Sequence, residues 1–254
     1  MIKLIINADD CGNTAGMNSA IGDCIEEGII SSTTVMAVSG GGQFITAVEL
    51  YKQYSDNISF GAHLNLTSGE PLSAVHVPCF LQEGFCKKDN GKVLFNGLRY
   101  RWKYVSPALA RAIYGELDAQ LKKIEDAGIR VSHIDSHQHI HYSPWLMPIF
   151  CKLAEAHSIK RMRRPKTIVD YSVKNCVKLL YNECLLYHMR HLSKTDFFFS
   201  VHDYLNLKNK KDGIYELMCH PGHDKPYYQL ELSQLRDYLN HHPEVELINY
   251  NDLK

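Results

Sequence analysis

The segment IKLIINADD, residues 2–10, is a run of mostly apolar residues that ends in two aspartates. A nearly continuous apolar run of this length predicts a strand covered on both faces, as in a parallel sheet. Apolar residues then recur with helical spacing from Met17 to Ile25, and Gly28 is placed to end that helix. The first thirty residues therefore predict a β-strand followed by an α-helix.

The alternation of strand and helix patterns continues to the end of the chain. Further strand patterns cover residues 32–38, 58–66, 129–135, 159–163, 197–201, 214–220 and 244–250, and helix patterns cover residues 44–54, 106–127, 146–157, 171–192 and 232–242. The helix over 106–127 is the clearest, because Ser106 can cap it and Pro107 suits its first turn. Strands joined by helical crossovers are parallel, and eight candidate strands favour a closed barrel over an open doubly wound sheet.

The length of the chain agrees with this fold class. A chain of 254 residues is normal for one α/β barrel, so we predict a single domain over residues 1–254 with a distorted, TIM-like (β/α) barrel. Residues 68–105 and 164–196 do not fit the alternation, and we predict that both are insertions.

Composition narrows the partners and the compartment. The chain has 28 Lys and Arg against 28 Asp and Glu, so no excess positive charge is present to hold nucleic acid or an anionic membrane. Eight cysteines are scattered without CxxC pairs, which indicates reduced thiols in a cytoplasmic protein. The sequence contains no apolar run of about 18 residues, so we expect neither secretion nor membrane insertion.

Polar residues with metal-binding or acid–base chemistry follow several of the predicted strands. Asp9 and Asp10 end the first strand, His63 lies in the third, and His220 follows the seventh. In barrel enzymes the carboxyl ends of the strands carry the chemistry, so these residues are expected to share one pocket. Each also has a structural interpretation, because the aspartates could cap a turn, His63 could be a core residue and His220 a turn residue.

A second concentration of such residues is HIDSHQHIHYSP, residues 133–144. His133, Asp135, His137, His139 and His141 are spaced by two, so they would line one face if a strand continued through them. We expect Asp135 and His137 to reach the pocket. For His133 and His141 a structural role is favoured, one inside the barrel layers and the other on the following loop.

Carboxylates and imidazoles from different strands suit a divalent metal. These groups bind Zn²⁺, Mn²⁺, Co²⁺, Ni²⁺ or Fe²⁺, and a face with three ligands leaves positions open for water and substrate. A remaining aspartate could take the proton of the water, and a histidine could protonate the leaving group. The pattern indicates metal-assisted hydrolysis without naming a substrate.

The ordered motifs NADDCG, GIISSTTVMA, GAHLNLTSGEPL, HIDSHQHIHYSP and ELMCHPGH resemble those of the YdjC-like carbohydrate deacetylases. The resemblance extends from residue 5 to about residue 250. It implies a barrel related to the polysaccharide deacetylases, removal of acetyl groups from acetylated amino-sugar oligosaccharides, and a divalent metal, usually Mg²⁺. The two imidazoles suit zinc or another transition metal at least as well.

The resemblance also assigns roles by position. It implies that Asp10, His63 and His137 are the metal ligands, that Asp9 is the catalytic base and that His220 is the catalytic acid.

Further residues are expected around these five. Asp135 would orient a ligand or the base, His139 would lie near the pocket, and Arg163 or Arg164, with Arg164 preferred, would hold the base carboxylate ionised. Cys11 stands where many relatives have an aromatic residue. The insertion over 76–105 is expected to supply aromatic residues that contact sugar, namely Phe80, Phe85, Tyr100 and Trp102.

Two other functions remain open at this stage. The same ligands serve other metal-dependent amidohydrolases and phosphoesterases, and a noncatalytic sugar sensor could keep the pocket. The oligomeric state is also open. A homodimer would have to use helices or insertions, since a closed barrel has no free strand edge.

Overall fold

A computed structural model describes residues 1–97, 104–169 and 172–254 of the chain. Its main sheet has seven strands in the order β6-β3-β2-β1-β8-β7, with β9 also paired to β1, and all of these pairings are parallel. The strands are β1 (Ile2–Cys11), β2 (Ser32–Val35), β3 (Ser59–Leu64), β6 (Ile134–Ser136), β7 (Phe197–Ser200), β8 (Gly213–Cys219) and β9 (Glu246–Leu247).

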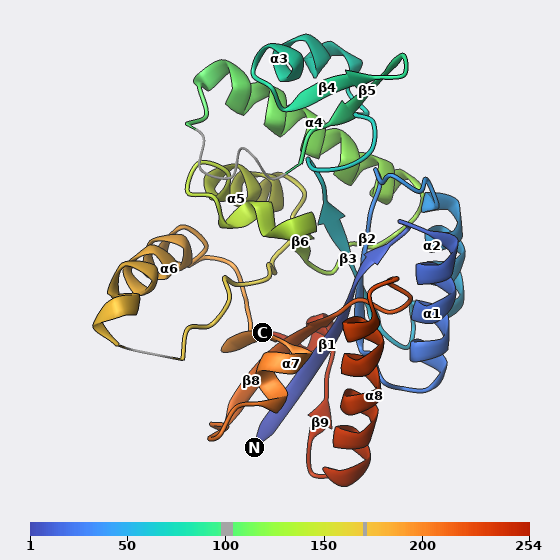
Figure 1. The fold of residues 1–254 in the computed structure, drawn as a ribbon, viewed down its shortest axis with the longest axis vertical. Coiled ribbons are helices and arrows are strands. Elements are labelled where there is room, and N and C mark those ends of the chain that lie inside the picture. The colour runs from blue at the N-terminus through green and yellow to red at the C-terminus, as the bar shows by residue number, and fades with distance from the viewer. Residues whose placement is uncertain (98–103, 170–171) are drawn as a thin grey trace.

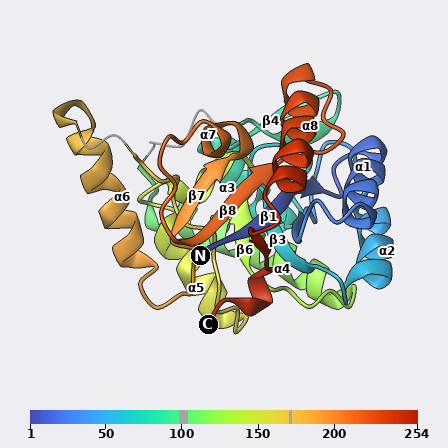
Figure 2. The same ribbon diagram turned by 90° about the horizontal axis from the view of Figure 1, so that it is seen from below.

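Helices connect these strands and surround the curled sheet (Figures 1 and 2). They are α1 (Ala15–Glu26), α2 (Phe44–Tyr54), α4 (Pro107–Asp126), α5 (Met147–Ala156), α6 (Cys176–His188), α7 (Val201–Leu205) and α8 (Pro226–His241). The predicted start of α4 is confirmed, because the Ser106 hydroxyl accepts a hydrogen bond from the Leu109 amide at 3.2 Å. The α/β class and the distorted barrel are confirmed as a parallel, curled sheet covered by helices.

Among residues 1–97, 104–169 and 172–254, no regular eighth strand closes the barrel. Residues 159–163, predicted as a strand, make only single bridges, from Met162 to Ile134 of β6 and from Arg161 to Ser193. Further along, the Thr167 amide donates to the Phe198 carbonyl of β7 at 3.0 Å. Pro165 has no amide hydrogen to donate, and the insertion follows directly, so this segment links the two edge strands without becoming a strand itself.

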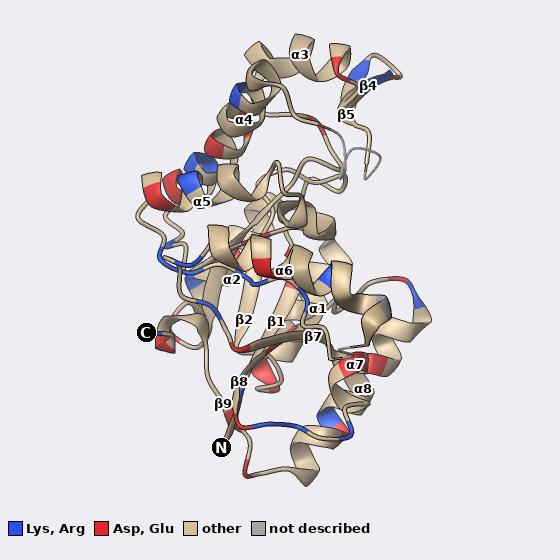
Figure 3. Cartoon of the chain, turned by 90° about the vertical axis from the view of Figure 1, so that its left-hand side faces the viewer, with Lys and Arg blue, Asp and Glu red and all other residues tan. Residues whose placement is uncertain are grey.

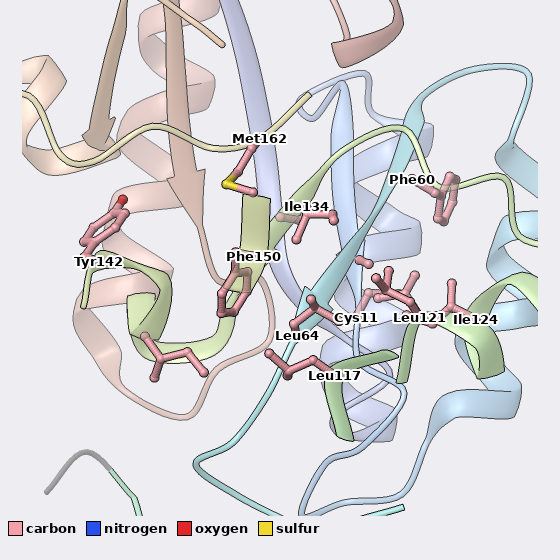
Figure 4. Packing of buried hydrophobic residues seen from close by; sticks show 14 of the residues in the cluster. Cys11, Phe60, Leu64, Leu117, Leu121, Ile124, Ile134, Tyr142, Phe150 and Met162 are labelled. Atoms are coloured by element: carbon pink, nitrogen blue, oxygen red, sulfur yellow. The ribbon is translucent and has the colours of Figure 1, made fainter. Parts of the chain in front are cut away.

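Strand β1 lies in the centre of the sheet, and its residues from Leu4 to Cys11 are all buried. This explains the nearly continuous apolar run, because both faces of the strand are covered. Figure 4 shows part of the core, in which Leu64 and Ile134 from the strands lie near Leu117 of α4 and Phe150 of α5.

The first insertion forms a small unit above α4. It contains a 3-10 turn (Ala74–His76), α3 (Val77–Gln82) and the antiparallel hairpin β4 (Cys86–Asp89) and β5 (Lys92–Phe95). The rings of Phe80 and Phe85 are buried against each other, and Phe80 also contacts Phe95, so the expectation that these two contact sugar is wrong. They are the apolar core of the insertion. Tyr100 and Trp102 lie outside the described residues.

The second insertion carries α6, which projects from the body of the molecule (Figure 1). Charges of both signs are interspersed along α4 and α5 (Figure 3), in keeping with the balanced composition. Within the described ranges, none of the helices is long and apolar enough to cross a membrane.

Candidate active site

The end of β1 brings two adjacent carboxylates into one site. Neighbouring residues of a strand normally point to opposite faces, but Asp10 has a φ of +67° and the pairing with β2 shifts register between Ala8 and Cys11. Such a bulge redirects side chains. As a result, Asp9 and Asp10 both face histidines of the site.

Asp10, His63 and His137 converge on one point. The Oδ1 atom of Asp10 lies 3.2 Å from Nε2 of His63 and 3.8 Å from Nε2 of His137. These residues come from β1, β3 and the turn that follows β6. The three expected metal ligands are therefore adjacent in space.

Hydrogen bonds on the far side of each imidazole fix which nitrogen faces Asp10. Nδ1 of His63 donates to Oδ1 of Asp135 at 2.6 Å. The Thr67 hydroxyl donates to Asn65 Oδ1 at 3.0 Å, so it accepts from Nδ1 of His137. In the neutral form of each ring, both Nε2 atoms then carry a lone pair directed at the same place.

This arrangement fits a divalent cation. Within the described residues Asp10 Oδ1 is buried and accepts no hydrogen bond, so three acceptor atoms face one another without a donor between them. Burial opposes protonation of His63, but the negative charges of Asp135 and other nearby carboxylates raise its pKa to about 10, so the local field favours positive charge. One oxygen and two imidazole nitrogens are a ligand set for zinc and other transition metals.

A second group of possible ligands overlaps with the first. Atoms of Asp9, His63 and Asp135 also lie within 4.8 Å of one another. However, the carboxylates of Asp9 and Asp135 both bind the guanidinium of Arg163, and Nδ1 of His63 is used by Asp135. Arg163 therefore already engages Asp9 and Asp135, whereas the facing atoms of Asp10, His63 and His137 are available to a cation, and Asp135 orients His63.

Arg163 is fully buried and bridges three carboxylates. Its Nη1 and Nη2 atoms bind the two oxygens of Asp9 at 2.8 and 2.7 Å, Nη1 lies 2.6 Å from Asp135, and Nε donates to Glu216 at 2.6 Å. Burial acts to raise the pKa of Asp9, but the charge and hydrogen bonds of Arg163 hold it well below its usual range. Asp9 is thus kept ionised.

The other arginine considered from the sequence, Arg164, points elsewhere. Its Nη1 atom donates to the carbonyl of Thr195 at 3.4 Å. The preference for Arg164 as the partner of the base is therefore corrected to Arg163. The two are adjacent, and only the backbone direction at this irregular segment decides which side chain enters the site.

Behind Arg163 lies a layer that the sequence interpretation missed. The Tyr250 hydroxyl donates to Oε2 of Glu216 at 2.6 Å, and both side chains are fully buried. Burial raises the pKa of Glu216 to about 7. The sequence could have indicated a role for Glu216, because it is an acidic residue inside the otherwise apolar strand IYELMC. No feature of the sequence around Tyr250 indicates its contact with Glu216.

His220 closes the other side of the site. Its Nε2 atom lies 3.9 Å from Oδ2 of Asp9, and its ring centroid is 4.5 Å from that of Tyr228. Burial lowers the pKa of His220. The expected base and acid therefore face each other beside the three clustered ligands.

The remaining histidines of the 133–144 run do not share a face. Strand β6 ends at Ser136, and Gln138 and His139 both have a φ of +54° within the 3-10 segment His137–Tyr142. The His139 ring stacks on Tyr142 at 5.1 Å, with an 8° interplanar angle, and burial lowers its pKa to about 3. The strand thus stops before the side chains of His139 and His141 could line up.

His133 and His141 are buried packing residues. The His133 ring stacks on Tyr250 with centroids 3.4 Å apart, and Nδ1 of His141 is hydrogen-bonded to the Ser136 hydroxyl. His139 lies closer to the site, because it contacts the Phe198 ring that the Arg163 guanidinium also covers.

Comparison with known proteins decides the family. A family model described as YdjC-like protein matches residues 3–251. The chain belongs to the YdjC-like family. A carbohydrate deacetylase of Brevibacillus brevis is 29% identical over 269 residues, covering 99% of this YdjC-like chain and 100% of the relative. A carbohydrate deacetylase of Vibrio parahaemolyticus is 30% identical over 233 residues, covering 89% and 80%.

Solved structures agree on the fold of this YdjC-like protein. A protein from Enterococcus faecalis, provisionally named for cellobiose-phosphate cleavage, has a TM-score of 0.72 at 21% identity and covers 98% of this chain and 97% of its own. A lactam utilization protein from Thermus thermophilus has a TM-score of 0.53 at 12% identity, with 96% and 98% covered.

Proposed function

We propose that this YdjC-like protein is a metal-dependent hydrolase that removes acetyl groups from N-acetylated sugars and short oligosaccharides of the chitobiose type. The observation that carries the proposal is the convergence of Asp10, His63 and His137 beside the facing pair Asp9 and His220. The names of the relatives supply the substrate class. Eight free cysteines support a cytoplasmic setting, and the balanced charge supports a small uncharged partner.

The ligand residues define where a cation would act. Asp10 Oδ1 and the Nε2 atoms of His63 and His137 would hold a divalent ion, Mg²⁺ according to the family or Zn²⁺ and its neighbours according to ligand preference. Such an ion supplies Lewis acidity that polarises a carbonyl and lowers the pKa of water. Asp135 and Thr67 keep the two imidazoles in the tautomer that this role needs.

The protein's own groups would move the protons. Asp9, ionised by its contact with Arg163, accepts a proton from the water whose oxygen bonds to the acetyl carbonyl carbon. The carbon–nitrogen bond then breaks while Nε2 of His220 donates a proton to the departing nitrogen. Acetate and a free amino sugar are the products, and proton transfer from Asp9 to His220, directly or through water, restores the starting state.

Acetate release tests the proposal. Metal-stripped protein would be supplied with Mg²⁺, Zn²⁺, Mn²⁺, Co²⁺ or Ni²⁺ and given N-acetylglucosamine or its β-1,4-linked disaccharide. We expect restored release with wild-type protein and a loss of at least about 100-fold in Asp10→Asn and His137→Ala. Asp23→Asn, at an exposed position on α1, is the matched control.

Metal binding and product analysis decide the remaining outcomes. Calorimetry should give weaker metal binding in Asp10→Asn and His137→Ala than in Asp23→Asn, whether or not the sugars are substrates. Phosphate release from phosphate esters without acetate release would replace the proposal with a phosphoesterase. Sugar binding by metal-loaded protein without turnover would replace it with a sensor.

A further inference from the structure

A cavity of about 580 Å³ opens directly beside His220. Its lining residues come from the irregular segment after α5, from the ends of β7 and β8, from α7 and from α8, and they include Lys166, Ser200, His202, Tyr227 and Glu231. A second cavity, of about 440 Å³, shares His202 and Gln234 with the first and continues along α7 and α8. Together they form a groove that leads away from the site, which we call the α7–α8 groove.

The position of His220 decides what part of a substrate would enter this groove. His220 would protonate the nitrogen that leaves with the sugar, so the sugar ring that bears this nitrogen must lie against it. A further ring linked to that sugar extends away from Asp9 and the metal ligands. The cavity whose wall contains His220 is the space available in that direction.

One wall of the groove is aromatic. Tyr227 is 49% exposed and its ring centroid lies 4.0 Å from that of Tyr228, which in turn packs against His220 at 4.5 Å. Tyrosine combines an apolar face with a polar tip. An exposed tyrosine ring in the wall of a cavity that also contains polar groups matches the C–H face of a pyranose ring and its hydroxyl edge.

Other residues around the cavity, including Glu231 one turn after Tyr227 on α8, offer hydrogen-bonding groups whose charges are already balanced. Lys166 Nζ lies 2.5 Å from Oδ2 of Asp203, which also accepts the Ser200 hydroxyl at 2.6 Å. Glu231 is only 8% exposed, and among the described residues its carboxylate accepts one hydrogen bond, from the His202 amide at 3.3 Å. A carboxylate has about four acceptor positions. These residues can therefore accept sugar hydroxyls and have no excess positive charge that would favour a phosphate.

We propose that the α7–α8 groove is a subsite for an uncharged second sugar ring, held by Tyr227 through stacking and by Glu231 through its hydroxyl groups. The inference rests on the proposed deacetylase function and sharpens it, because it makes linked sugars better substrates than a single N-acetylated sugar. Tyr227 and Glu231 become residues that determine chain-length specificity.

Kinetics on two substrates test the subsite. We expect wild-type kcat/KM to be at least tenfold higher for the N-acetylated disaccharide than for the monosaccharide. Tyr227→Ala and Glu231→Gln should each lower the disaccharide value about tenfold and leave the monosaccharide value within twofold. Tyr187→Ala, which removes a similarly exposed tyrosine from α6, should change neither value. Equal losses on both substrates, or no wild-type preference for the disaccharide, would overturn the proposal.

A binding measurement separates this inference from the proposed function. The deacetylated disaccharide would be titrated into wild-type, Tyr227→Ala and Tyr187→Ala proteins by calorimetry. Weaker binding in Tyr227→Ala alone supports the subsite even if no acetate is released from any sugar, in which case only the deacetylase assignment fails. Equal binding in all three proteins rejects the subsite. The 6-phosphate of the disaccharide should bind no more tightly than the uncharged sugar, and tighter binding contradicts an uncharged ligand.

Discussion

Arg163 is a fully buried cation surrounded by Asp9, Asp135 and Glu216. A buried charge is tolerated only when it is paired and hydrogen-bonded, and removal of one partner leaves the others buried without compensation. The same guanidinium holds Asp9, the proposed base, in position. It also contacts Asp135, the residue that orients His63. A single side chain thus supports both the stability of the sheet interior and the geometry of the site.

Replacement of Arg163 should be severely destabilising. We expect Arg163→Ala to lower the free energy of unfolding by about 3 to 5 kcal/mol, measured by urea denaturation. Arg236→Ala is the control, because its 2.6 Å pair with Glu27 is exposed and should contribute less than about 1 kcal/mol. Similar losses in the two variants would contradict the role assigned to the buried cluster.

The Tyr250 hydroxyl should affect turnover more than substrate binding. Tyr250→Phe keeps the ring stacked on His133 but removes the bond to Glu216, and so loosens Arg163 and Asp9. We expect kcat to fall about tenfold with KM unchanged, the size of one lost hydrogen bond to a charged group.

Tyr204→Phe is the matched control for that substitution. Tyr204 is equally buried. In the described part of the chain its hydroxyl is hydrogen-bonded only to Tyr238, and neither residue belongs to the site. Its kcat should stay within twofold of wild type. Equal losses in Tyr250→Phe and Tyr204→Phe would show a general effect of removing buried hydroxyls.

Glu216 should make stability fall as pH rises. Burial raises its folded-state pKa from 4.5 to about 7, so the folded protein binds this proton more tightly than the unfolded chain does. The resulting stability is fully present below pH 4.5 and is lost as pH rises through 7. Between pH 5 and pH 8, wild type should lose up to about 3 kcal/mol more than Glu216→Gln in urea titrations. Parallel curves for the two proteins would contradict the raised pKa.

At the scale of elements, sequence periodicity predicted most helices and strands. When one or both faces of an element are buried, its apolar residues recur in the sequence with the period of that element. Strand β1 and helix α4 are the clearest examples. The end of β6 could not be predicted in this way, because alternating histidines fit a strand while the left-handed backbone at Gln138 and His139 depends on the surrounding fold. The choice between Arg163 and Arg164 could not be predicted from the sequence either, because their segment is not a regular strand and its backbone direction follows from no local pattern.

The turn after β8 should be sensitive to a single methyl group. Gly222 has a φ of +71°, and a Cβ atom there would lie 2.6 Å from the Gly16 carbonyl and 2.9 Å from Met17 Cα at the start of α1. Gly222→Ala should therefore displace the loop that carries His220, lowering both stability, by more than about 2 kcal/mol, and activity.

Gly28→Ala separates steric contact from backbone strain. Gly28 has a similar φ of +67°, but a Cβ atom added there would meet no atom of the described residues within 4 Å. This variant should lose only about 1 kcal/mol and keep its activity. An equal effect at Gly28 and Gly222 would mean that backbone strain alone, without close packing, accounts for the loss.

At the scale of the molecule, the parallel topology explains why the positions of the site residues were predictable while their partners were not. Asp10, His63 and His220 all follow or end strands, so their meeting at one edge follows from the strand directions. The contact between Glu216 and Tyr250 depends on how the last residues pack beneath the sheet, which no local pattern encodes. The incomplete closure of the barrel near Met162 also depends on the packing of the whole barrel and not on a local sequence pattern.

The central position of β1 also has a consequence for biosynthesis. Residues 2–8 of β1 pair with β8, and Lys3 and Leu4 also pair with β9. The strand partners of residues 2–8 therefore lie within residues 213–247, more than 200 residues later in the chain. Closing so long a loop is entropically costly, and such non-local pairing is slow. While the chain is still being translated, its first strand exposes an apolar, unpaired edge of the kind that associates with other chains. Residues up to at least His220 must therefore leave the ribosome before the site can assemble, and until then the nascent chain depends on protection from aggregation.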